Sequence, residues 1–147
     1  MTANLGRPYS DVVELADESA ATATGTGTAV AAPGGRIGAM QFIFDLTSAA
    51  STGSDTLDVY VETTLDGTNW IEIVHFAQVT GSATTYQMAG KIVAGLKEDL
   101  FTTSATGPKL AASAHRDLFG SQYRAKWTIT DDSGSASFAF TVNMLPC

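Results

Sequence analysis

The sequence predicts an all-β fold, an antiparallel β-sandwich or jelly-roll-like domain with an extended N-terminal arm. Thr, Ala, Ser and Gly are abundant in the 147 residues, and Lys and Glu are scarce for a helical protein. Several short segments alternate apolar and polar residues with a period of two, which is typical of strands with one buried face. Polar turns separate them, with no regular helices between, which excludes a parallel α/β sheet.

The first predicted strands follow one another from Thr26 onward. Thr26–Ala32 is closed by Pro33-Gly34-Gly35, a strong turn sequence. Ile37–Thr47 is the next predicted strand, and Thr85–Ile92 is a further candidate. Ile37–Thr47 alternates with a period of two, and we expect one face to carry Met40, Phe42, Phe44 and Leu46.

Two hairpins are predicted. Thr56–Leu65 and Trp70–Phe76 flank an Asp66-Gly67 step, where glycine accepts the positive φ of a tight reversal. The alternation also predicts that His75 lies on the face opposite Trp70, Val74 and Phe76. Gln122–Thr130 and Ser135–Met144 flank an acidic turn and are predicted to form a second, C-terminal hairpin.

Two segments do not alternate clearly. Residues 1–25 are small, polar and rich in Gly, so we assign them to an extended arm and residues 26–147 to the β-sandwich domain. Within the arm, only Asp11–Ala16 has the apolar content for a short helix or strand. In the region 93–115, a helical turn at Leu96–Leu100 is the most regular element that the sequence allows.

Charge and composition narrow the classes of function. Eight basic and fifteen acidic residues give a formal net charge of −7, which disfavours nucleic-acid binding. We expect no membrane association, because no apolar run approaches the ~20 residues of a membrane span and the N-terminus does not resemble a signal peptide. The single cysteine, Cys147, cannot form an intramolecular disulfide and suits a reducing compartment.

The residues do not assemble a recognisable active site, so we expect no enzymatic activity and no cofactor. His75 and His115 lack neighbouring cysteines for a zinc site, and no serine lies in a G-x-S-x-G context. A Ser-His-Asp group remains open, since such triads are defined by geometry. Asp131 and Asp132 are candidates for a calcium site, but a role in forming the turn is favoured, because aspartate is common in turns.

The two tryptophans leave a choice between core packing and sugar stacking. Trp70 and Trp127 each lie within a predicted hairpin strand. A tryptophan on an alternating strand is more often buried, because its large apolar surface gains most there. A carbohydrate-binding module is therefore the alternative function.

One segment carries a family resemblance. Val59–Phe76 contains Thr64-Leu65-Asp66-Gly67-Thr68-Asn69-Trp70 and ends in His75-Phe76. This pattern resembles a hairpin of small virion proteins of tailed phages, in which a Ser/Thr-x-Asp-Gly-x-x-Trp turn joins two strands. The strand around Tyr123–Trp127, with its acidic turn, is also similar, so the resemblance extends over about residues 37–144.

The resemblance implies a non-enzymatic capsid decoration protein, also called a cement or head-stabilising protein. Such proteins are jelly-roll-like, often homotrimeric, and reach neighbouring subunits with an arm. The implied partners are the major capsid protein and further copies of this chain, and the implied location is the phage head, assembled in the host cytoplasm. A head fibre, neck or tail component is the other virion role. In the arm, the expected partner-binding residues are Arg7, Pro8, Tyr9, Val12, Val13 and Leu15.

Overall fold

The computed structural model describes residues 12–34, 37–50, 54–80, 85–95 and 111–147. In these ranges the chain forms strands and connecting segments, without a helix. The predicted helical turn at 96–100 lies outside the described residues. The strands are β1 (Val13–Ala21), β2 (Gly25–Thr26), β3 (Val30–Ala31), β4 (Ala39–Ala50), β5 (Thr56–Thr64), β6 (Trp70–His75), β7 (Val79–Thr80), β8 (Tyr86–Val93), β9 (Ala114–His115), β10 (Gln122–Thr130) and β11 (Ser137–Pro146).

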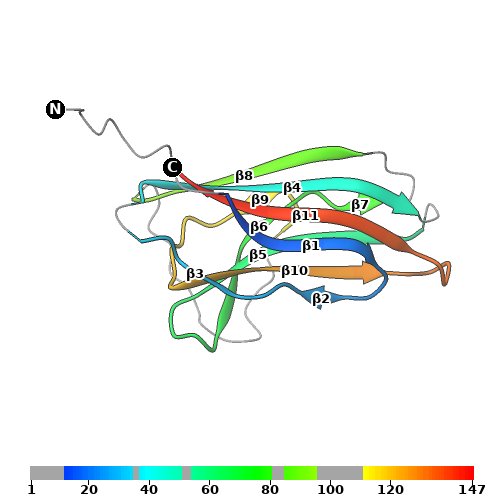
Figure 1. The fold of residues 1–147 in the computed structure, drawn as a ribbon, viewed down its shortest axis with the longest axis horizontal. Coiled ribbons are helices and arrows are strands. Elements are labelled where there is room, and N and C mark those ends of the chain that lie inside the picture. The colour runs from blue at the N-terminus through cyan, green and yellow to red at the C-terminus, as the bar shows by residue number, and fades with distance from the viewer. Residues whose placement is uncertain (1–11, 35–36, 51–53, 81–84, 96–110) are drawn as a thin grey trace.

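The strands form two antiparallel sheets that pack face to face (Figure 1). The four-stranded sheet has the order β1-β11-β4-β8, and the larger sheet has the order β2-β10-β5-β6-β9. Short β3 pairs with β10, and short β7 pairs with β5. The predicted all-β sandwich is confirmed.

The order of pairing is that of a jelly roll. β1 pairs with β11, β2 and β3 pair with β10, β4 pairs with β8, and β5 pairs with β6. These pairs are nested, as if one long hairpin had been rolled up. Rolling brings β11 beside β4 and β10 beside β5, and so closes the two sheets.

The core lies between the sheets and is built from the alternating positions of the long strands. The four residues expected on one face of β4 are 0 % exposed. They meet side chains of the facing sheet, as in the tilted pair of Phe42 and Tyr123, whose ring centroids are 6.1 Å apart. Burial of each large apolar side chain contributes about 1.5–3 kcal/mol. The other long strands contribute Leu57, Val59, Val61, Ala125, Trp127, Phe138, Phe140, Val142 and Met144.

The first predicted hairpin is confirmed, and aspartate organises its turn. The carboxylate of Asp66 accepts hydrogen bonds from the backbone N–H groups of Thr68 and Asn69, both at 2.8 Å. These bonds hold the pKa of Asp66 well below its usual range, since they favour the charged form. Gly67 has a φ of 79°, as the tight turn requires.

The face assignment in β6 needs one correction. A register shift between Val61 and Glu62 in the β5–β6 pairing inserts a bulge into β6. The bulge lets Ile73 and Val74 both join the core. Trp70 therefore lies on the outer face of the sheet, the face that also carries His75, and not on the face of Val74 and Phe76.

The predicted C-terminal hairpin is wrong in its pairing, although both strands are present. β10 pairs with β5 in the larger sheet, whereas β11 pairs with β4 and β1 in the four-stranded sheet. The turn at 131–134 therefore crosses from one sheet to the other. Both strands have an apolar face, and placing them in opposite sheets lets the two faces pack against each other in the core.

The boundary between arm and domain also needs correction. Val13–Ala21 is not an extended arm but the edge strand β1, and Gly25–Thr26 forms β2. Leu15, Ala16 and Ala21 of β1 belong to the hydrophobic core. Of the predicted arm, residues 1–11 lie outside the described residues.

Candidate functional site

The residues expected to bind a partner through the arm have different environments. Val12 is 59 % exposed, just before β1, and Val13 is partly buried against the core. Leu15 is only 2 % exposed and packs inside this chain, so it is not available as an anchor for a partner. Arg7, Pro8 and Tyr9 lie outside the described residues. Val12 is thus the described arm residue with a free apolar surface.

His75 is part of a stacked and hydrogen-bonded cluster on the outer face of the larger sheet. Its Nε2 lies 2.9 Å from Oδ1 of Asp58, and its ring stacks on Tyr60 with centroids 4.0 Å apart. The other carboxylate oxygen of Asp58 accepts a hydrogen bond from the Gln78 amide at 2.8 Å. Burial, followed by the nearby charges of Asp58 and Glu72, raises the pKa of Tyr60 to about 12.

His115 is the second residue of β9 and is paired more loosely. Its Nε2 is 3.8 Å from Oδ1 of Asp117, the oxygen that accepts a hydrogen bond from the Val93 N–H at 3.0 Å. Within the part of the chain that the structure describes, Ser113 makes no hydrogen bond with His115. That group of Ser113, His115 and Asp117 therefore lacks the contact between nucleophile and base that a triad requires.

An ion-pair network covers the outer face of β5, β6 and β10. Glu62 accepts from Arg124 Nη2 at 2.8 Å and lies 3.3 Å from Lys126 Nζ, which is also 3.1 Å from Glu72. Burial lowers the pKa of Lys126, but the charges of Glu62 and Glu72 outweigh it, and the net shift is upward. Because both glutamates are already neutralised by these cations, their geometry favours a role in holding the sheet together over acid–base catalysis.

The two tryptophans have separate roles. Trp127 is 5 % exposed in the core, and its indole N–H donates to the carbonyl of Ala23 at 3.0 Å. Trp70 is partly exposed, but the Arg124 guanidinium stacks over its ring, 4.0 Å from the centroid. Trp127 is therefore buried away from any sugar ligand, and one face of the Trp70 ring is covered by Arg124.

The acidic turn between β10 and β11 uses its carboxylates internally. Oδ1 of Asp131 accepts hydrogen bonds from the backbone N–H groups of Gly134, Ser135 and Ala136. These contacts account for Asp131 as a turn-forming residue. In the described ranges, no group of three or more His, Cys, Asp or Glu side chains is arranged to hold a metal ion.

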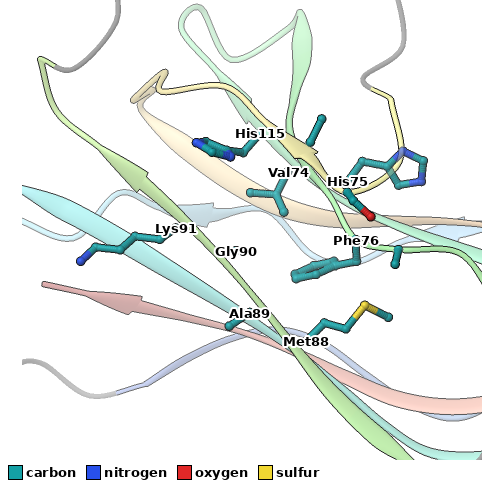
Figure 2. A pocket seen from close by; sticks show the side chains of 11 residues that line it. Val74, His75, Phe76, Met88, Ala89, Gly90, Lys91 and His115 are labelled. Carbon is teal, nitrogen blue, oxygen red and sulfur yellow. The ribbon is translucent and has the colours of Figure 1, made fainter.

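A pocket of about 490 Å³ opens where the edges of the two sheets meet (Figure 2). Val74 and Phe76 line it from the larger sheet, and Met88 and Gly90 of β8 line it from the four-stranded sheet. His115 lies at one side of it, and Lys91 points away from the apolar residues. Its lining is more apolar than polar, and it is partly open to solvent.

No local pattern in the sequence indicates this pocket. Its lining comes from β6, β8 and the segment 113–115, which lie far apart in the chain and meet only through the jelly-roll topology. Charged residues at the polar positions of alternating strands are a local indication of the ion-pair network. The pairing of β5 with β6 and β10, which brings those residues together, is not indicated by any local pattern.

The fold and the site define a jelly-roll β-sandwich with a pocket between the sheet edges at β8 and β9 and an ion-paired outer face on the larger sheet. Comparisons with protein-family models, with curated proteins and with solved structures each found no match. In the described part of the chain, no helix is long and apolar enough to cross a membrane.

Proposed function

We propose that the protein is a non-enzymatic structural protein of a virion that acts as a capsid decoration protein. The nested jelly-roll pairing of β1 with β11 through β5 with β6 carries this proposal. Double-sheet jelly rolls recur in capsid and lectin domains, so the topology fits the role that the tailed-phage resemblance implies. The fold alone does not determine function, which is why the side chains of the site matter.

The side chains support a packing role. The side chains that were candidates for catalysis or metal binding have partners within the chain. His75 is paired with Asp58, Glu62 is paired with Arg124, and Asp131 accepts hydrogen bonds from its own turn. A rigid, ion-paired outer face suits a protein that adds buried area across subunit boundaries, because binding to the assembled shell stabilises it by mass action. The major capsid protein and neighbouring copies of this chain are the proposed partners on the phage head.

The N-terminal segment is the proposed contact with the capsid. Val12 exposes an apolar side chain at the point where residues 1–11 join β1. Arg7, Pro8 and Tyr9 precede it in sequence. A segment that adopts an extended conformation on binding lies along an exposed strand edge of a partner and exchanges main-chain hydrogen bonds with it.

Co-sedimentation with capsids assembled from the major capsid protein of the same virus tests the proposal. We expect the full chain to pellet with the capsids, and a variant lacking residues 2–11 to remain folded but to stay in the supernatant. A deletion of residues 1–25 is unsuitable, because it removes β1 and the core residue Leu15. A full chain that never pellets with capsids contradicts the decoration role, and an equal affinity of the shortened chain contradicts the role of the arm.

A further inference from the structure

The two edges of the four-stranded sheet differ in how they are protected. β1 carries Glu14, Asp17 and Glu18, and its pairing with β11 has two register shifts. Charges and bulges are the usual protection of an edge strand against pairing with another chain. β8 pairs with β4 over eight consecutive residues without a shift, and Lys91 is its only charged residue.

The main-chain groups of β8 that face away from β4 can be identified. Ala39 exchanges its hydrogen bonds with Cys147, and the N–H of its β8 neighbour Val93 donates to Asp117. Ala39 and Val93 are therefore a non-hydrogen-bonded pair. The alternation of an antiparallel ladder then directs the N–H and C=O groups of Gln87, Ala89 and Lys91 away from β4. In the described part of the chain these groups have no hydrogen-bond partner.

We propose that β8 is a dimerisation edge, which pairs antiparallel with β8 of a second copy about a two-fold axis at Ala89. Ala89 then lies opposite Ala89 of the second copy, and Gln87 lies opposite Lys91 in both directions. This isologous contact joins the two four-stranded sheets into one continuous sheet. The three hydrogen-bonded pairs supply up to about six main-chain hydrogen bonds.

The outward-facing side chains are complementary in this register. Asp45 neighbours Gln87 on the same face of the sheet, and the Gln87 amide donates to its carboxylate at 3.3 Å. Lys91 of the second copy lies next to Gln87 and within reach of Asp45, so each half of the interface joins a cation to an anion. The two Lys91 side chains are about four residues apart along the strands, or about 14 Å, which limits their repulsion.

The inward-facing side chains also fit. In the same register Met88 of one copy lies opposite Gly90 of the other. Gly90 packs closely against the larger sheet, because a Cβ there would lie 2.8 Å from Cγ1 of Val74. Met88 of the second copy thus reaches the mouth of the pocket, next to Val74 and Phe76, and covers apolar surface that is open in the single chain.

Sedimentation equilibrium of the full chain tests the proposal with Ala89→Pro and the matched control Ala89→Ser. Proline removes the outward N–H of Ala89 without touching a bond to β4, so the fold is retained while the edge is blocked. We expect a wild-type dimer whose Kd rises about tenfold or more in Ala89→Pro, because the proline of each copy removes one N–H donor and two hydrogen bonds are lost. Ala89→Ser is expected to dimerise like the wild type.

A charge exchange tests the same register without a change in the backbone. Lys91→Glu alone is expected to weaken the dimer, and Lys91→Glu with Asp45→Lys is expected to restore it. A wild-type chain that remains monomeric over the concentration series overturns the proposal. A dimer or trimer that is indifferent to Ala89→Pro and to Lys91→Glu overturns it as well.

Discussion

Asp55, the residue before β5, holds Ser133 in the turn that follows β10. The carboxylate of Asp55 is 0 % exposed and accepts hydrogen bonds from the Ser133 hydroxyl at 2.7 Å and from the Ser133 N–H at 3.0 Å. The Asp132 N–H donates to the same carboxylate at 3.0 Å. The start of β5 thereby fixes the turn that crosses between the sheets from β10 to β11.

Asp55→Ala is expected to lower the free energy of unfolding by about 2–4 kcal/mol, because it leaves several donors of the crossing turn without an acceptor. Chemical denaturation measures this loss. Asp132→Ala is the control, since the Asp132 side chain is exposed, and it is expected to change stability by less than about 0.5 kcal/mol. Equal effects of the two substitutions would contradict the role of Asp55.

Gly25→Ala is expected to destabilise the protein by about 1–3 kcal/mol through overpacking. A Cβ at this position would lie 2.6 Å from the Trp127 ring, which packs on the β2 backbone. Gly34→Ala is the matched control, because nothing lies within 4 Å of its added Cβ. Thermal unfolding of both variants measures the difference, and a neutral Gly25→Ala would mean that β2 moves away from Trp127 at little cost.

Glu62→Gln is expected to cost about 3 kcal/mol, at the lower end for breaking a buried ion pair, because Arg124 and Lys126 keep partial solvent access. Glu14→Gln, at an exposed position of β1, is the control and is expected to be nearly neutral. Denaturation curves in low and high salt measure both. A Glu62→Gln variant as stable as the wild type would show that the network is replaceable by neutral hydrogen bonds.

Alkaline pH is expected to destabilise the fold through Tyr60. Its pKa rises from 10.0 to about 12 in the folded chain, so the unfolded chain loses this proton first. The resulting stabilisation is fully present below pH about 10 and is lost as the pH rises through about 12. The upward pKa shift of Lys126 acts in the same direction. Unfolding midpoints measured across this range are expected to fall less steeply for Tyr60→Phe than for the wild type.

The sequence predicted the strands well because their alternation is local. The buried residues Phe42, Phe44, Phe138 and Phe140 follow the period of two along β4 and β11. Alternation identifies the buried face of a strand but not its neighbour in the sheet. The adjacent strands β10 and β11 were therefore predicted to form a hairpin, although they belong to opposite sheets.

The errors in β1 and β6 have a common cause. In β1 the register shifts place Leu15 and Ala16, two consecutive residues, in the core, and in β6 a bulge does the same for Ile73 and Val74. A bulge interrupts the period on which the prediction rests. The pocket and the free edge of β8 depend on strand order across the whole chain, so no local pattern indicates them.

The pairing of β1 with β11 has a consequence for the way the chain acquires its structure. Val13 and Met144 are neighbours in the four-stranded sheet although most of the chain lies between them. A ribosome must therefore synthesise the chain through β11 before β1 finds its partner, and until then Leu15 has no complete core in which to pack. Such distant pairing makes folding slow, because the loop must close before the contacts stabilise it. A partial product of synthesis that ends before β11 leaves one edge of β4 without its partner strand.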